Sequence, residues 1–151
     1  MPVRSRRKKQ PEAEAAFTLV EHPADIGIEA WGPDLASAFE QAALGLISVI
    51  VDPATVLPER SREVRVTASD VDQLLVRWLS ELLYLVDGED FVPSSCTIIS
   101  IEPRSLLALC RGETHRPERH TPRTEVKAIT YHQLSVRSGN DGARVRVFLD
   151  I

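Results

Sequence analysis

Residues 68–90 read ASDVDQLLVRWLSELLYLVDGED, and they carry the clearest secondary-structure signal in the chain. Apolar side chains recur there at the spacing i, i+3, i+4 and i+7, which predicts one buried face of an α-helix. Asp70 is a suitable N-cap, Gln73 follows three residues later as in a capping box, and Gly88 is expected to end the helix. The apolar face consists of Val71, Leu74, Leu75, Trp78, Leu79, Leu82, Leu83 and Val86.

A second amphipathic helix is predicted upstream of this one, after Pro33. Asp34 supplies its N-cap. The helix is expected to stop by Asp52, because Pro53 disfavours helical geometry in the residue before it. Its apolar stripe consists of Leu35, Ala38, Phe39, Ala42, Leu46, Val49 and Ile50.

Alternating apolar and polar side chains predict strands before, between and after the two helices. The order is ββαβαββββ, which lacks the strict strand–helix alternation of a parallel α/β fold. We therefore expect an α+β domain in which two helices pack on a largely antiparallel sheet. The expected strands cover residues 17–22, 26–32, 61–68, 95–103, 105–112, 124–138 and 143–151.

Length and charge limit the classes of function open to this chain. A chain of 151 residues fits one domain, with residues 1–15 as a disordered basic tail and residues 16–151 as the folded part. No apolar segment follows the basic tail and no stretch is long enough to cross a bilayer, so we expect a cytoplasmic protein without a membrane partner. Residues 16–151 hold 13 basic and 20 acidic side chains. We expect a folded part with this excess of acidic side chains to bind RNA or DNA poorly and to suit a basic protein partner or a cation.

The two cysteines, Cys96 and Cys110, flank a turn expected at Pro103 and Arg104. A regular hairpin about that turn places Cys96 opposite Arg111, so the two thiols point to opposite faces of the sheet. A disulfide between them is not expected, and two reduced thiols fit a cytosolic protein.

Acids and histidines in short turns are the candidates for chemistry, because the chain has no Walker, GxGxxG, HExxH, CxxC or GxSxG signature. Asp25 lies in the tight connection EHPADIGI. It either caps a turn by accepting backbone N–H bonds or serves as a ligand of a hard cation. His22, in the same connection, is either a packing histidine or a ligand.

The C-terminal stretch RVRVFLDI, residues 144–151, ends an apolar strand with two negative charges. Asp150 and the α-carboxylate of Ile151 repel each other unless a cation sits between them. A third carboxylate from another loop would complete an all-oxygen site of the type that Ca²⁺, Mg²⁺ or Mn²⁺ prefers over zinc. The alternative is that the strand end frays into water with its charges solvated.

The remaining polar candidates lie between residues 113 and 132. A strand over residues 124–138 places Glu125 and Lys127 on one face, either as a solvated charge pair or as functional groups. The segment ETHRPERHTPR, residues 113–123, is expected to be a mobile surface loop that contacts a partner or RNA at most secondarily.

Five segments, taken in order, resemble the archease family: HPADIGIEAWG, LASAFEQAALGL, DQLLVRWLSELLYL, TEVKAITYHQLSV and VFLDI. The resemblance spans residues 17–151. It implies a small α+β protein that is not an enzyme itself. Such proteins are accessory factors of the GTP-dependent, Mn²⁺-using RtcB-type RNA ligase, which acts in tRNA splicing and RNA repair. They promote guanylylation of the ligase and its multiple turnover.

The resemblance also implies the residues of a metal site. Carried over by motif, the ligands are Asp25, Asp150 and Ile151, the last through its terminal carboxylate or carbonyl. Lys127 is implicated in the partner interaction or activation. The cofactor is then a divalent cation, Ca²⁺ in isolation or Mn²⁺ or Mg²⁺, and RNA is contacted only indirectly through the ligase. Pro23 stands where the first motif more commonly has threonine in this family. This difference leaves Asp25 in place.

Two other classes of function stay open on the sequence. A stand-alone metal-dependent phosphohydrolase could use the same acids, with His22 or His132 as its general base. A metal-free, chaperone-like binding module would use no metal at all.

Overall fold

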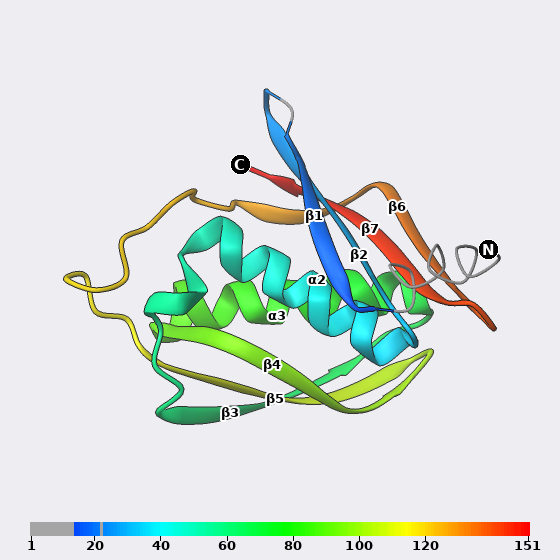
Figure 1. The fold of residues 1–151 in the computed structure, drawn as a ribbon, viewed down its shortest axis with the longest axis horizontal. Helices are drawn as coiled ribbons and strands as arrows, with labels where there is room; N and C mark the ends of the chain where they lie inside the picture. Colours follow the sequence, from blue (N-terminus) through cyan, green and yellow to red (C-terminus); the bar gives the residue numbers. More distant parts are fainter. Residues whose placement is uncertain (1–13, 22) are drawn as a thin grey trace, which may run out of the picture.

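The two helices form the middle layer of the molecule, between two antiparallel sheets (Figure 1). This computed structural model describes residues 14–21 and 23–151, so most of the predicted basic tail lies outside the described residues. The predicted α+β class and the order ββαβαββββ are confirmed. The strands divide into two sheets, however, where the sequence predicted one. Each helix therefore packs against strands of both sheets.

The four-stranded sheet carries the candidate functional residues. Its strand order is β1-β2-β7-β6, and all neighbouring strands are antiparallel. The last strand of the sequence is thus an inner strand of this sheet. The predicted strand over residues 124–138 begins later than expected, because residues 124–127 belong to an irregular connection. The strands are β1 (Ala16–Glu21), β2 (Asp25–Gly32), β6 (Ala128–Gly139) and β7 (Gly142–Asp150).

The three-stranded sheet covers the opposite side of the helices, with the order β3-β5-β4. Its strands are β3 (Arg60–Thr67), β4 (Phe91–Glu102) and β5 (Ser105–Thr114). The helices are α2 (Leu35–Ile50) and α3 (Val71–Glu89), and a short 3-10 turn covers Pro53–Thr55. In the part of the chain that the structure describes, no helix is both long and apolar enough to span a bilayer.

Side-chain caps explain where the two helices begin. The Asp34 side chain accepts from the Ser37 N–H at 2.9 Å, and the Asp70 side chain accepts from the Gln73 N–H at 2.8 Å. The predicted end of α3 is wrong, because Gly88 lies inside the helix. The helix ends instead at Asp90, whose φ of 57° is left-handed.

Small and large side chains alternate in the core between the layers. Trp78 of α3 is fully buried, and its Nε1–H donates to the Phe39 carbonyl of α2 at 3.0 Å. A Cβ at Gly45 would lie 2.9 Å from Cγ2 of Ile28, so this glycine lets α2 approach β2 closely. The core therefore fixes how the helices sit against the four-stranded sheet.

The predicted register of the two cysteines is wrong. Cys96 of β4 lies directly opposite Cys110 of β5. The register shifts between Ile98 and Ser100, where β4 contains one extra residue, Ile99. A bulge moves every following residue of the strand to the other face, which is why the two thiols meet. Both are free cysteines.

Candidate functional site

Asp25 and Asp150 are direct cross-strand partners on β2 and β7. Opposed residues of an antiparallel pair have Cα atoms about 4.5–5.5 Å apart and project on the same face. That face is the outer one, since Val147 and Leu149 are fully buried on the helix side while Asp150 is exposed. The structure thus brings together two of the predicted metal ligands from the two ends of the folded chain.

Lys127 lies beside this acidic pair. Its backbone N–H donates to the Asp150 carbonyl at 2.7 Å, and the next residue, Ala128, opposes Asp150 from β6. Lys127 is exposed and precedes β6, although the sequence placed it inside a strand. The Lys127 backbone therefore borders Asp150 on the β6 side.

Ile151 follows Asp150 with its side chain packed against the hydrophobic core. Side chains alternate along an extended chain, so an outward Asp150 is followed by an inward Ile151. This packing holds the main-chain atoms of Ile151 next to Asp150. The third predicted ligand is therefore adjacent to the acidic pair.

The donor set at this corner suits a hard divalent cation. Two side-chain carboxylates and main-chain oxygens of Ile151 are all oxygen donors, which Ca²⁺ and Mg²⁺ prefer. Within residues 14–21 and 23–151, no three His, Cys, Asp or Glu side chains gather closely enough to hold a metal ion. The further donors would therefore be main-chain oxygens or water. His22 lies outside the described residues, and Asp25 is the first residue of β2.

A buried aromatic ring lies between the acidic pair and the rest of the outer face. Phe148 projects outward two residues before Asp150, yet it is only 4% exposed. Its ring lies against Gly27, where an added Cβ would be 2.9 Å from Phe148 Cε2. Gly27 is required because a side chain there would displace this ring.

Strand β6 bends toward Phe148. The pairing of β6 with β7 is interrupted between Thr130 and Ser135, and Gln133 in that interval has a left-handed φ of 50°. The His132 ring meets the Phe148 ring edge-on with 5.8 Å between centroids. His132 is thus a packing residue in this structure, and the sequence offered no signal for the interruption.

The connection from β5 to β6 is anchored, which contradicts the predicted mobile loop. The backbone N–H groups of Arg123 and Thr124 donate to the carbonyls of Ile50 and Val49 at 2.8 and 3.1 Å. Val126 is buried in the core at 4% exposure. The end of the connection is therefore fixed to α2, and this fixes the position of Lys127.

A buried ionic network stabilises the β5 end of this connection. Glu113 and His120 are 2% and 0% exposed, with His120 Nε2 2.8 Å from Glu113 Oε2. His120 Nδ1 accepts from the Arg116 N–H at 2.9 Å, so the neutral ring carries its proton on Nε2 and donates it to Glu113. The Leu57 N–H donates to the same carboxylate oxygen at 2.8 Å, and Arg119 pairs with the other oxygen.

The network holds the pKa of Glu113 below its usual range. Burial alone raises the pKa of this carboxyl, but the Leu57 amide, the His120 ring and the Arg119 guanidinium together outweigh it. Sequence reasoning missed this role. The clue was an acid placed at the start of a segment rich in histidine and arginine.

Comparison with known proteins agrees on one family. A sequence model of the Archease protein family matches residues 17–151. The protein archease of Methanosarcina acetivorans is 39% identical over 145 residues, which cover 93% of this chain and 99% of that protein.

Solved structures are similar to this fold. The solution structure of Methanobacterium thermoautotrophicum protein 1598 has a TM-score of 0.76 and 32% identity, covering 90% of this chain and 99% of that one. The crystal structure of an archease from Thermotoga maritima, described as a possible chaperone, has a TM-score of 0.56 and 16% identity, covering 87% and 94%. The match to the family model includes both Asp25 and Asp150. The chain belongs to the archease family.

Proposed function

We propose that this protein is a cytoplasmic accessory factor of a GTP-dependent, RtcB-type RNA ligase in tRNA splicing and RNA repair. It does not join RNA itself but promotes guanylylation of the ligase and its multiple turnover. Family membership supports the proposal, together with one observation on this chain. That observation is the direct opposition of Asp25 and Asp150 on an outer sheet face.

The acidic pair is the proposed metal-binding element. Asp25 and Asp150 supply side-chain oxygens from neighbouring strands, and Ile151 supplies its terminal carboxylate or carbonyl. A divalent cation held there, Ca²⁺ in isolation or Mn²⁺ or Mg²⁺, would neutralise charge that develops on phosphates during guanylylation. Asp25 and Asp150 would hold the cation on the outer face of the sheet, where a partner can reach it.

Lys127 is the proposed contact for the partner. Its backbone is fixed by the hydrogen bond to the Asp150 carbonyl, and the residue is exposed. The acidic surface of residues 16–151 suits a basic, RNA-binding enzyme, because complementary charge raises the rate of association. Lys127 would then contact the ligase at the edge of the acidic pair.

A C-terminal extension tests the role of Ile151. Fusing a short neutral tag after Ile151 converts the α-carboxylate into an amide, so stimulation of the ligase is expected to fall with the thermal unfolding midpoint unchanged. The same tag placed before Met1 is the control and is expected to leave stimulation intact. Equal stimulation by both tagged proteins would refute the terminal carboxylate as a ligand.

Calorimetry with Ca²⁺ and Mn²⁺ separates the proposal from a chaperone-like module. Binding heat that disappears in Asp150→Asn supports the metal site. The absence of any heat favours a metal-free, chaperone-like module; the Thermotoga maritima archease is described as a possible chaperone.

A further inference from the structure

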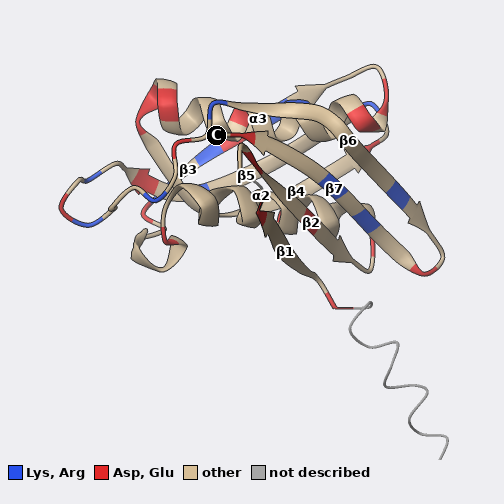
Figure 2. Cartoon of the chain, turned by 90° about the horizontal axis from the view of Figure 1, so that it is seen from above, with Lys and Arg blue, Asp and Glu red and all other residues tan. Residues whose placement is uncertain are grey.

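The outer face of the four-stranded sheet carries a second like-charged pair, at the other end of β7 from the acidic one. Arg137 of β6 and Arg144 of β7 are direct cross-strand partners. Arg146 lies two residues along β7 and therefore projects on the same face. Figure 2 shows these basic positions on β6 and β7. Like charges directly opposite each other destabilise a sheet, so an anion between them would relieve the repulsion.

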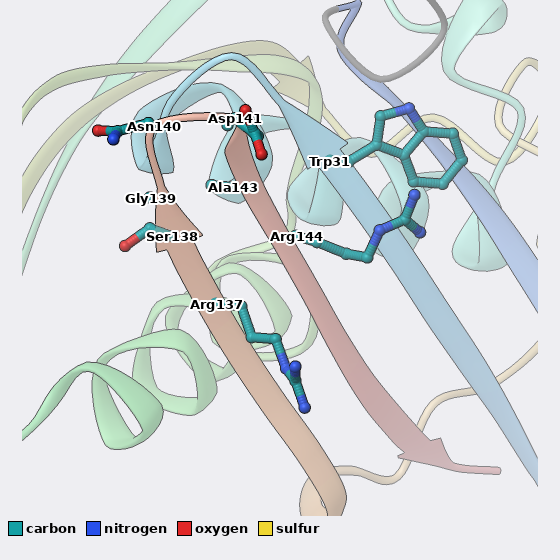
Figure 3. Close-up of a pocket in the computed structure, with 9 residues that line it drawn as sticks. Trp31, Arg137, Ser138, Gly139, Asn140, Asp141, Ala143 and Arg144 are labelled. Carbon is teal, nitrogen blue, oxygen red and sulfur yellow. The ribbon is translucent and has the colours of Figure 1, made fainter. Parts of the chain in front are cut away.

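An indole ring adjoins these arginines. Trp31 of β2 is the cross-strand partner of Arg144, whose guanidinium lies 4.7 Å from the ring centroid. Figure 3 shows the Arg144 side chain reaching across to Trp31, with Arg137 along the neighbouring strand. A hollow of about 310 Å³ runs past these three side chains to the turn at Asn140 and Asp141. We call Trp31, Arg137, Arg144 and Arg146 the arginine–tryptophan patch.

The patch keeps positive charge available for a ligand. Arg144 lies 3.9 Å from a carboxylate oxygen of Glu29, and Arg146 donates from Nε to the neutral Gln133 carbonyl at 3.1 Å. Arg137 is exposed and forms no ion pair with any residue in the described ranges. Asp141 at the turn lines the hollow, whereas Glu29 is not among its lining residues. Three guanidinium groups therefore face two carboxylates.

We propose that the arginine–tryptophan patch binds single-stranded RNA directly. Guanidinium groups recognise phosphates bidentately, and an indole with a neighbouring guanidinium offers planar surfaces on which unpaired bases stack. Acidic side chains would satisfy the charges, but unlike nucleotides they do not bring an aromatic ring with each negative charge to stack on Trp31. Binding at an exposed face of this kind covers about 4–16 nucleotides and needs no base pairing.

This inference goes beyond the proposed accessory function and does not depend on a ligase. It replaces the expectation that RNA is contacted only indirectly. That expectation was based on the total charge of the folded part, whereas the structure shows where on the surface the individual charges lie. Asp25 and Asp150 lie at one end of the outer face, and Arg137 and Arg144 lie near the other end with Glu29 beside them. Asp150 and Arg144 are about 20 Å apart along β7 at about 3.4 Å per residue.

The test uses the full chain without any partner. Fluorescence anisotropy of a labelled oligouridylate of about 12 nucleotides, within the usual range of site sizes, measures affinity over a series of salt concentrations. The logarithm of the affinity should fall linearly with the logarithm of salt, with a slope of about −0.7 for each phosphate contacted. Emission of Trp31 should be quenched on binding, while the fully buried Trp78 is shielded.

Two kinds of variant separate charge from stacking. Arg137→Ala and Arg144→Ala together should weaken binding at least tenfold and reduce the salt slope by about 0.7 per lost phosphate contact. Trp31→Ala should weaken binding about tenfold, equivalent to about 1.4 kcal/mol, with the slope unchanged, and Trp31→Phe should recover part of it. Arg65→Ala on β3, in the other sheet, is the matched control and should leave binding unchanged.

Three outcomes would overturn the proposal. One is no binding at low salt with the circular dichroism spectrum intact. Another is equal loss of affinity in Arg65→Ala and in the double variant, which would mean nonspecific charge attraction. The third is full competition by polyglutamate together with no effect of Trp31→Ala, which would assign the patch to an acidic protein surface.

Discussion

Asp25 and Asp150 occupy one position of the four-stranded sheet, directly opposite each other on β2 and β7. Two carboxylates in such a position repel each other in the empty protein and attract a cation together. The packed Phe148 ring on one side and the Lys127 backbone bond on the other limit how far the chain can relax. We propose that this acidic pair serves to bind a cation rather than to stabilise the sheet.

Removing one acid should have opposite effects with and without metal. We expect Asp150→Asn to leave the metal-free protein as stable as the wild type, or more stable by about 0.2–1 kcal/mol, because it removes a like-charged pair. The wild type should gain stability on addition of Ca²⁺ or Mn²⁺, by about 2.7 kcal/mol at a hundredfold excess over Kd, and the variant should not. Thermal unfolding measures both effects. Glu102→Gln is the control, and a destabilised metal-free Asp150→Asn would contradict this account.

Gly27→Ala should destabilise the sheet beside the acidic pair. The new Cβ would lie 2.9 Å from the Phe148 ring, so we expect a loss of about 1–3 kcal/mol in the free energy of unfolding. Phe148→Leu in the same chain should recover part of that loss, because the shorter side chain clears the added methyl. Urea unfolding of the single and double variants measures the coupling between the two positions.

Gly139→Ala is the matched control for this cycle, since an added Cβ there has no neighbour within 4 Å. Equal destabilisation by Gly27→Ala and Gly139→Ala would show that lost glycine flexibility, not the Phe148 ring, sets the cost.

Low pH should destabilise the connection between β5 and β6, because Glu113 becomes protonated. Its pKa is held below the usual value near 4.5, so its contribution to stability is present above about pH 4.5 and is lost as pH falls through the lower folded-state pKa. We expect Glu113→Gln to be less stable than the wild type near neutrality and the difference to shrink below pH 4.5. Urea unfolding between pH 3 and 7 checks the sign. A difference that grows on acidification would contradict it.

The two cysteines should react slowly in the folded protein. The hydrogen bond with Cys110, together with burial, raises the pKa of Cys96 well above its usual value, and Cys110 itself is fully buried. The thiolate is the reactive form, so alkylation at pH 8 should be slow until urea unfolds the chain. Mass spectrometry of the native and unfolded protein counts the modified thiols. Prompt modification of both thiols in the native state would refute the arrangement in which a fully buried Cys110 lies opposite a half-buried Cys96.

The cysteines also show where sequence reasoning stops. The turn at Pro103 and Arg104 is correctly predicted, with Glu102 and Ser105 paired beside it. One bulged residue, Ile99, then reverses the faces of everything beyond it. An isolated extra residue leaves no period-two signal of its own, so the register past it cannot be read from the alternation.

The sequence by itself determined the elements that depend on near neighbours. The helices follow from a 3.6-residue apolar period and the caps at Asp34 and Asp70, and most strands follow from a two-residue period. Only the tertiary structure decided the division into two sheets, the meeting of Asp25 with Asp150, and the opposition of Arg137 and Arg144. These relationships depend on how distant strands align while each helix packs against strands of both sheets. That alignment is set by packing across the whole core, which no local period encodes.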